Sequence, residues 1–157
     1  MASAQQPSTA SIETDFGTIE LELWPDAAPL HVANFRKLAR AGFYRGTGFH
    51  RIVPGFVIQG GCPEGDGTGG PGWTVPAEFN ARRHVKGVLS MARSAHPDSA
   101  GSQFFICLGD APHLDGQYSA FGRVTAGMDV VEQIAAVECD AHGRPVGRLP
   151  EMRIVNA

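Results

Sequence analysis

Two segments of the chain place long polar side chains inside runs that are otherwise largely apolar. The first, FHRIVPGFVIQGG at 49–61, contains Arg51 and Gln59, and the second, GSQFFICLG at 101–109, contains Gln103. A guanidinium stays charged at any relevant pH and offers several N–H donors in a fixed fork, whereas a lysine or histidine would hydrate more strongly or titrate. These residue types suit a site that donates hydrogen bonds to a polar atom rather than one that transfers protons.

The same residue types also have a purely structural interpretation, which the sequence alone leaves open. An arginine in a strand is usually a charge on a solvated face, and Phe56, Phe105 and Leu114 would ordinarily be assigned to the core. Glutamine within a strand is less easily explained by packing alone. The glutamines are therefore the stronger hint of a functional surface.

Strand alternation indicates which of these side chains share a face. It puts Gln103 with Phe105 on one face of a strand, and it likewise puts Val57 with Gln59 on one face. Phe56 would point away from Val57 and Gln59 unless the proline-glycine pair that precedes it distorts the strand. The position of Phe56 is thus a geometric question for the structure.

Nucleotide and metal sites are not predicted. GDGTGG at 65–70 matches GxGxxG, but Pro71 follows where a helix would have to begin, so we interpret the segment as a loop whose glycines permit positive φ. The six histidines lie far apart, with no HExxH motif and no Cys/His cluster. We interpret His50, beside Arg51, as a hydrogen-bonded structural histidine.

Nucleophilic catalysis is not predicted either. Four serines are nucleophiles in name only, because none sits in a GxSxG elbow with recognisable acid and base partners. These serines are Ser90, Ser94, Ser99 and Ser102. The three cysteines are an odd number at wide spacing, so we expect reduced thiols, with Cys107 buried as a small hydrophobe and Cys62, beside glycines, more exposed.

Composition and charge narrow the classes of function. A length of 157 residues suits one compact core, and 20 glycines with 11 prolines predict many turns and short strands, which favours a β-rich domain. A net charge of −3, with 13 scattered Lys and Arg residues, argues against nucleic-acid binding. No apolar run approaches the ~18 residues of a spanning helix, and the opening MASAQQPSTA lacks the features of a signal peptide, so we expect a cytoplasmic protein without membrane attachment.

The hydrophobic pattern predicts a loose tail at 1–9 and one domain at 10–157, with order beginning near Ser11. Helical spacing, strand alternation and the positions of glycine and proline define its elements. These are a hairpin at 12–23 with its turn at 15–17, a helix at 29–41, two short strands around a turn at 49–60, a loop at 60–76, strands at 88–91, 103–108, 120–124 and 152–155, and a second helix around 128–135. The strand at 103–108 is apolar on both faces and is therefore expected to be central.

The segments at 49–61 and 101–109, joined by MARSAHPDSA at 91–100, resemble the signature of the cyclophilin family of peptidyl-prolyl isomerases. The likeness runs from about Ser11 to Val155. It implies a mainly β fold, a closed eight-stranded antiparallel barrel capped by two α-helices, with the active cleft on its outer face. It also implies an enzyme that accelerates rotation about Xaa-Pro peptide bonds without a cofactor or metal.

Carried over only where residues match, the resemblance makes Arg51 the catalytic donor and adds Phe56, Gln59 and Phe105 to the catalytic set. Residues expected to bind the substrate are Val57, Ala92, Arg93, Gln103, His113, Leu114 and Tyr118. In this scheme Arg51 donates to the prolyl nitrogen in an apolar pocket. Gln59 and Gln103 are expected to hold the substrate backbone.

The chain departs from the family pattern at several positions. His113 stands where many cyclophilins carry a tryptophan that supports tight binding of the inhibitor cyclosporin, so we expect weak cyclosporin affinity with turnover retained. Tyr118, Val57 and Cys62 replace a histidine, a methionine and an acidic residue that are often found there, and we expect them to alter substrate preference more than mechanism. Arg93 lies in a loop similar to that of bacterial cytoplasmic members and is expected to contribute only its backbone.

Two other functions remain open beside the isomerase. One is a non-catalytic module that binds proline-containing peptides, and Arg51 and Phe105 argue against it. The other is a holdase-type chaperone that uses the same apolar cleft and could coexist with catalysis. The expected partners are proline-containing peptides and unfolded or folding proteins, and a monomer is the default.

Overall fold

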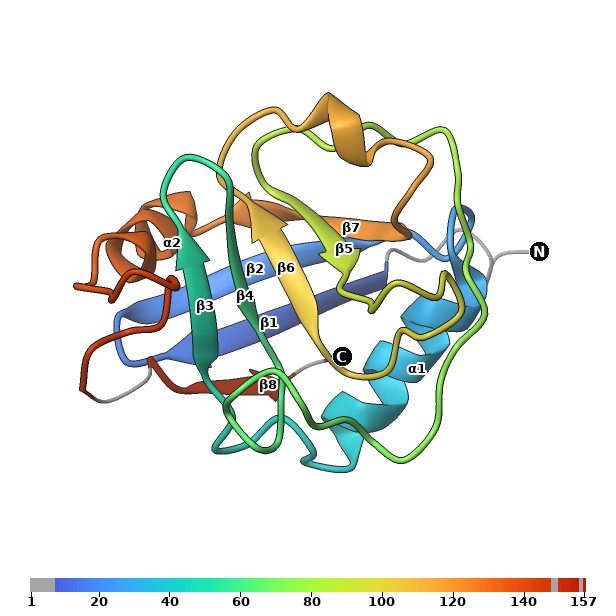
Figure 1. Ribbon diagram of the computed structural model, residues 1–157. Coiled ribbons are helices and arrows are strands. Elements are labelled where there is room, and N and C mark those ends of the chain that lie inside the picture. Colours follow the sequence, from blue (N-terminus) through green and yellow to red (C-terminus); the bar gives the residue numbers. More distant parts are fainter. Residues whose placement is uncertain (1–7, 148–149, 156) are drawn as a thin grey trace.

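Eight antiparallel strands form the framework of the protein. The computed structural model describes residues 8–147, 150–155 and 157. Within these ranges the strands form one sheet in the order β3-β4-β6-β5-β7-β2-β1-β8, which curls round on itself (Figure 1). In chain order the elements are β1 (Ser8–Thr14), β2 (Gly17–Leu23), α1 (Pro29–Arg40), β3 (Phe49–Val53), β4 (Val57–Gly60), β5 (Val88–Met91), β6 (Phe104–Cys107), a 3-10 helix (Pro112–Leu114), β7 (Ala120–Ala126), α2 (Met128–Ala135) and β8 (Met152–Val155).

The predicted eight-stranded antiparallel barrel is confirmed, and it is nearly closed. β3 and β8 are the two edges of the sheet. At the seam between them, Phe49 N–H donates to the Pro150 carbonyl and Met152 N–H donates to the Thr47 carbonyl, each at 2.9 Å. Further along β3 the edge is taken by a loop instead, because Ile52 N–H donates to the Gly143 carbonyl at 2.6 Å. The loop thus occupies the space in which a continuous ladder to β8 would run.

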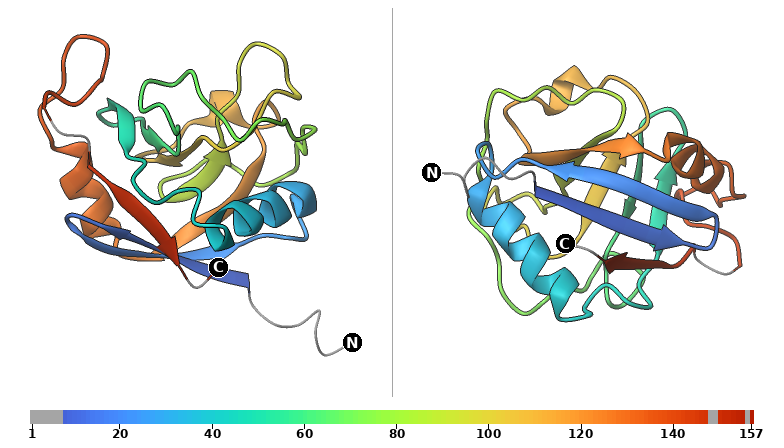
Figure 2. Two further views of the ribbon diagram at one scale, coloured as in Figure 1. Left: turned by 90° about the horizontal axis from the view of Figure 1, so that it is seen from below. Right: turned by 180° about the vertical axis from the view of Figure 1, so that it is seen from behind.

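Two helices cover opposite ends of the barrel, as Figure 2 shows. α1 begins at Pro29, where the missing N–H of proline costs nothing, and ends at Arg40, shortly before Gly42 takes a φ of 76°. Each helix turns an apolar face to the interior of the barrel, where Phe35 of α1 and Val131 of α2 are fully buried. Both predicted helices are confirmed, and their burial helps to fix the curvature of the sheet that carries the site.

The central position predicted for the strand at 103–108 is confirmed. β6 lies between β4 and β5 in the sheet, and all four of its residues are buried. Phe104 and Ile106 point into the barrel interior, whereas Phe105 and Cys107 belong to a second apolar cluster on the outer face. One strand therefore serves both the core and the floor of an external site.

The other predicted elements are confirmed with shifts at their ends. β1 begins at Ser8, earlier than the expected start near Ser11. Of the tail predicted at 1–9, residues 1–7 lie outside the described residues, and the remaining two belong to β1. In the described ranges, none of the helices has the length and apolar character needed to cross a membrane.

Candidate active site

A slot of about 170 Å³ opens on the outer face of the sheet beside β4 and β6. It brings together most of the residues that the sequence predicted for the site: Arg51, Phe56, Val57, Gln59, Ala92, Arg93, Phe105, Leu114 and Tyr118. Gln103 and His113 do not line it. They contact its walls from outside, Gln103 through Gln59 and His113 through Phe56.

Strand pairing sets the lateral order of the polar and aromatic side chains in the slot. Arg51 pairs with Gln59 across β3 and β4, and Gln59 pairs with Phe105 across β4 and β6. Directly paired residues on neighbouring antiparallel strands point to the same face. A guanidinium, an amide and an aromatic ring therefore stand in one row across three strands.

Phe56 reaches the slot because it does not belong to a strand. It lies in the turn between β3 and β4, where Gly55 takes a φ of 76° and Phe56 N–H donates to the Val53 carbonyl at 2.9 Å. The Phe56 carbonyl in turn accepts from Leu108 N–H at 2.7 Å. Strand alternation therefore does not apply at this position, and Phe56 lines the same slot as Gln59.

A directional chain of hydrogen bonds holds the guanidinium. Arg51 Nη1 donates to Gln59 Oε1, and Gln59 Nε2 donates to Gln103 Oε1, each at 3.2 Å. Gln103 Nε2 then donates to the carbonyls of Gly67 and Gly69, at 3.0 and 2.9 Å. The glycine-rich loop predicted at 65–70 thus anchors the far end of the chain.

These hydrogen bonds limit what each of the two glutamines can offer a substrate. Both N–H groups of the Gln103 amide are already used by the loop, so Gln103 has no donor left for a substrate. Gln59 keeps one N–H and one lone pair free. Gln103 thus orients Gln59 and could offer a peptide only the second lone pair of its Oε1, whereas Gln59 could both donate and accept.

Aromatic contacts build the floor and one wall of the slot. The Phe105 ring, 5% exposed, meets the Tyr118 ring edge to face at 5.7 Å and 82°. The Arg93 guanidinium lies over Tyr118 at 4.7 Å, and Arg93 Nε donates to the Gln117 carbonyl at 2.9 Å. The Arg93 side chain is thereby fixed against the wall of the slot, which gives it a packing role beyond the backbone contribution that was expected.

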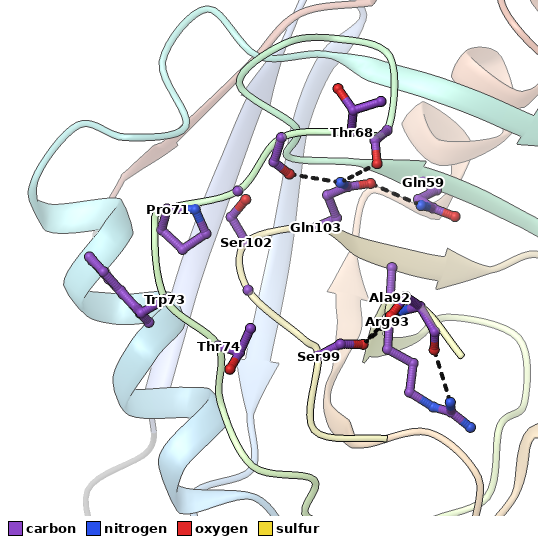
Figure 3. Close-up of a pocket in the computed structure, with 15 residues that line it drawn as sticks. Gln59, Thr68, Pro71, Trp73, Thr74, Ala92, Arg93, Ser99, Ser102 and Gln103 are labelled. Atoms are coloured by element: carbon purple, nitrogen blue, oxygen red, sulfur yellow. Dashed lines mark hydrogen bonds between the residues drawn. The ribbon is translucent and has the colours of Figure 1, made fainter. Parts of the chain in front are cut away.

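A second cavity, of about 350 Å³, adjoins the slot and shares Gln59, Ala92 and Arg93 with it. Figure 3 shows Gln103 directed between Gln59 and the glycine loop, with Pro71, Trp73 and Thr74 along one side of this cavity. A second cavity at this place was not predicted from the sequence. Its other lining residues are Gly67, Thr68, Gly69, Gly70, Ser94, Ser99, Gly101 and Ser102.

The ionisable groups of the slot do not form an acid-base pair. Among the described residues that line it, Arg51, Arg93 and Tyr118 can carry a proton, and there is no carboxylate, histidine or cysteine. Across the described part of the chain, the only hydrogen bond of the Arg51 guanidinium goes to Gln59, so most of its N–H groups have no partner among the described residues. The site is built to donate hydrogen bonds.

Comparison with known proteins identifies this arrangement. The family model described as "Cyclophilin type peptidyl-prolyl cis-trans isomerase/CLD" matches residues 9–157. The chain belongs to the cyclophilin family. It is a peptidyl-prolyl cis-trans isomerase with the mainly β, two-helix architecture described above.

Named relatives and solved structures agree with this assignment. Peptidyl-prolyl cis-trans isomerase B of Bacillus subtilis is 53% identical over 123 residues, which cover 77% of this cyclophilin and 85% of that protein. A peptidyl-prolyl cis-trans isomerase of Helicobacter pylori is 49% identical over 129 residues, covering 80% and 78%. A crystal structure of a cyclophilin-type isomerase from Cryptosporidium parvum superposes with a TM-score of 0.91 at 32% identity, covering 96% of this chain and 97% of that one. A second structure of it, determined in the presence of the dipeptide Ala-Pro, gives a TM-score of 0.90 and 32% identity, covering 94% and 98%.

Two side chains near the site of this cyclophilin differ from expectation. Cys62 is fully buried, not exposed, because the glycine loop folds over it and Gly69 N–H donates to its Sγ at 3.2 Å. Burial would raise the pKa of the Cys62 thiol, but backbone N–H groups of the loop, led by that of Gly69, lower it overall. His50 is buried as a structural histidine should be, yet its Nδ1 has no hydrogen-bond partner in the described part of the chain.

His113 occupies a distinctive place in this cyclophilin. Its ring stacks on Phe56 with the centroids 5.5 Å apart and the planes at 30°. It is exposed and does not line the slot itself. His113 therefore extends the rim formed by Phe56 without closing over the slot.

Proposed function

We propose that Arg51 catalyses prolyl isomerisation by donating a hydrogen bond to the prolyl nitrogen as the peptide bond twists. The observation that carries this proposal is the position of Arg51: its guanidinium is tied to Gln59 on one side and lines the same slot as Phe105. The two groups that the reaction needs, a donor and an apolar surface for the ring, thus face one space.

The chemistry of the amide explains why a donor is enough. The C–N bond resists rotation by ~18–20 kcal/mol because nitrogen shares its lone pair with the carbonyl. At the twisted midpoint this sharing is lost, and the nitrogen becomes pyramidal and basic. A donor aimed at that nitrogen stabilises the midpoint more than either planar form, which is the condition for a faster reaction. No proton is transferred, in keeping with a slot that has no base.

The lowering of the rotation barrier can be divided between the donor and the pocket. Uncatalysed isomerisation takes tens to hundreds of seconds, so turnover in milliseconds requires an acceleration of about 10⁵, or roughly 7 kcal/mol. One preorganised donor in a dry site typically contributes about 3–4 kcal/mol. The remainder must come from the grip on the proline ring and from the exclusion of water.

Phe56, Val57, Phe105 and Leu114 supply that grip in our proposal. Val57, Phe105 and Leu114 belong to one buried apolar cluster, and Phe56 packs against it. Arg51 is itself exposed, so water leaves its guanidinium only when a peptide covers the slot. The free N–H of Gln59 and the backbone of Ala92 and Arg93 would hold the peptide so that one side of the bond turns.

The substrate class proposed for this slot is a proline-containing peptide or an unfolded protein segment. Support comes from the related Cryptosporidium parvum cyclophilin, whose crystal structure was determined in the presence of Ala-Pro. A monomeric state, a cytoplasmic location and weak cyclosporin affinity remain predictions from the sequence. His113 supports the last of these, because an imidazole offers less apolar surface than an indole.

The test of this proposal is the isomerisation of short Xaa-Pro peptides by the wild type and by Arg51→Ala. We expect kcat/KM to fall by about 10²-fold or more, the effect of a lost preorganised donor. Arg45→Ala, the same change at an exposed arginine that does not line the slot, should retain the wild-type rate. Circular dichroism verifies that each variant is folded. Equal kcat/KM for Arg51→Ala and wild type would remove Arg51 from the mechanism.

A further inference from the structure

A buried serine and a buried histidine form a hydrogen-bonded triad with a partly exposed aspartate in this protein. His84 Nε2 lies 2.9 Å from Ser90 Oγ, and His84 Nδ1 lies 3.0 Å from Asp115 Oδ1. The same carboxylate oxygen also accepts from the backbone N–H of His84 at 2.6 Å. No acid or base partner for Ser90 could be recognised in the sequence, and that prediction is wrong, because the fold brings His84 and Asp115 together beside it.

The triad cannot act as a nucleophile. Ser90 is fully buried in β5, and His84 is 1% exposed. Neither residue lines the slot or the adjoining cavity, so no substrate carbonyl can approach Ser90 Oγ. A reaction of the serine-hydrolase type is therefore excluded at this place. The hydrogen bonds between these polar groups instead have a structural role, which is to hold neighbouring residues in position.

The triad lies directly beneath the floor of the slot. The His84 ring stacks against the Phe105 ring with the centroids 6.2 Å apart and the planes at 25°. Ser90 is the residue that pairs with Phe105 across β5 and β6. Phe105 is thus enclosed by His84 on the side away from the slot and by Tyr118 at its edge.

The triad also fixes the wall next to the floor. Asp115 directly follows Leu114, which lines the slot. In addition, Ala111 N–H donates to the His84 carbonyl at 2.8 Å, which ties the start of the same short 3-10 helix to His84. One histidine therefore joins three separate segments: its own loop, β5 beside Phe105, and the turn that carries Leu114.

The hydrogen bonds define the charge and tautomer of His84. A carboxylate only accepts, so Nδ1 must carry the proton that points to Asp115. In a neutral ring Nε2 is then an acceptor, and Ser90 Oγ–H donates to it. Burial lowers the pKa of His84, with His113 acting in the same direction and Asp115 opposing it. Arg83 is the remaining charged neighbour and acts on Asp115.

We propose that His84 is a positioning residue for catalysis: the Asp115–His84–Ser90 triad holds Phe105 and Leu114 at the separation that grips the proline ring. His84 touches no substrate and acts only through these two slot residues. The proposal rests on the proposed function in one respect, the role of the slot as the proline site. Loss of the triad should therefore weaken the grip on the peptide more than it affects the donor Arg51.

The test uses two variants that cut the triad at different places. His84→Asn removes the ring behind Phe105, and Ser90→Ala removes only the hydroxyl. Because the floor contacts the ring in both the planar and the twisted state, a displaced floor removes uniform binding, which raises KM more than it lowers kcat. We expect KM for an uncharged Xaa-Pro peptide to rise about five- to tenfold in each variant, the effect of one buried hydrogen bond, with a smaller change in kcat.

A matched control separates positioning from general destabilisation. His31 is also fully buried, also has a pKa lowered by burial, and bonds to the Pro76 carbonyl outside the slot. His31→Asn should lower stability without raising KM. Misfolding alone reduces the number of active molecules and so lowers kcat at constant KM. If His84→Asn does not fold, the smaller change Ser90→Ala decides the question.

A pH profile provides a second readout that a purely structural role would not move. Because burial lowers the pKa of His84, its ring becomes protonated only as the pH falls well below the ordinary histidine value of about 6.5. Protonation removes the acceptor for Ser90, and KM of the wild type should then rise. In Ser90→Ala that acceptor is already unused, so the rise should be absent. The rise should persist in His113→Gln, which removes the neighbouring imidazole that acts on His84.

The proposal is overturned if Ser90→Ala has the KM of the wild type and shows the same rise of KM at low pH. It is also overturned if His31→Asn raises KM as much as His84→Asn does. Arg51→Ala measured in parallel keeps the two proposals apart, because loss of the donor should lower kcat while leaving KM nearly unchanged. An active Arg51→Ala would overturn the donor mechanism and leave the His84 result standing. A wild-type KM in both triad variants would overturn the positioning role alone.

Discussion

The guanidinium of Arg51 is held from one side by Gln59, and its other N–H groups make no hydrogen bond to the described residues. The hydrogen bonds run in one direction, from Arg51 through Gln59 and Gln103 to the carbonyls of the glycine loop. Each amide accepts from the previous residue and donates to the next. An arginine on an exposed strand surface loses side-chain entropy when it becomes ordered. Because these hydrogen bonds already order Arg51 in the free protein, less of that entropy would be lost when a substrate binds.

The first prediction concerns the middle of that chain. Gln103→Leu removes the acceptor of Gln59 Nε2 and should lower kcat/KM about five- to tenfold, the effect of one lost hydrogen bond in a positioned network. Gln117→Leu makes the same change at an exposed position outside the slot lining and should leave kcat/KM unchanged. Peptide isomerisation assays on the two variants check this. An unchanged rate in Gln103→Leu would show that Arg51 needs no support beyond Gln59.

The second prediction concerns His113 and cyclosporin. The unmodified protein should bind cyclosporin weakly, in the micromolar range or above, since its imidazole presents little apolar surface. His113→Trp should tighten binding by about tenfold or more, because an indole over Phe56 would bury additional apolar area. Isothermal titration measures both affinities. A nanomolar dissociation constant for the unmodified protein would contradict this assignment.

At the scale of elements, the site depends on three adjacent strands and one loop. β3, β4 and β6 bring Arg51, Gln59 and Phe105 into one row, and the turn between β3 and β4 adds Phe56 at its edge. The glycine loop then anchors Gln103 from a distant part of the sequence. A short, well-paired hairpin next to a central strand is a rigid support, which a preorganised donor requires.

The third prediction concerns the junction at which β7 passes into α2. Gly127 has a φ of 92°, and a Cβ there would lie 2.5 Å from the Thr18 carbonyl oxygen. Gly127→Ala should therefore destabilise the protein by about 2–4 kcal/mol, more than the ~1–2 kcal/mol of a left-handed residue alone. Gly46→Ala isolates the latter cost, because Gly46 has a φ of 83° and nothing within 4 Å of its Cβ position. Urea unfolding compares them, and equal losses would contradict the steric argument.

Much of this element-level picture could be predicted from local pattern. Alternation at 103–108 predicted a central strand with two useful faces, and proline with glycine predicted the limits of α1. Phe56 could not be placed, because alternation fails inside a turn. Cys62 was wrongly predicted to be more exposed, because the neighbouring glycines that suggested an open loop instead let the loop fold tightly over the sulfur.

At the scale of the whole molecule, the remaining features depend on contacts between distant segments. Ser90 and His84 are close in sequence, but Asp115 reaches them only when the loop after β6 folds back. The cavity beside the slot combines the glycine loop with residues that precede β6, and no local pattern links those segments. The resemblance to a family predicted the barrel, but no pattern in the sequence predicted the seam between β3 and β8.

The fourth prediction concerns the response of the whole fold to acid. Burial lowers the pKa of His31, His50 and His84 below the ordinary histidine value. Below about pH 6.5 the unfolded chain therefore binds more protons than the folded chain, so stability is full above this pH and falls as the pH is lowered through the depressed values. The lowered pKa of Asp115 and Asp66 extends the loss to still lower pH. Thermal unfolding at pH 7.5 and 5.0 should show a lower Tm at pH 5.0, and an equal or higher one would contradict this.

The central claim is that Arg51 accelerates the rotation itself, and NMR exchange spectroscopy on a saturated Xaa-Pro peptide measures that step on the enzyme. For Arg51→Ala we expect the cis-trans exchange rate of the bound peptide to fall by about 10²-fold, while its dissociation constant changes by less than about threefold. An unchanged exchange rate on a folded Arg51→Ala protein would contradict the account, and so would a loss that lies entirely in binding.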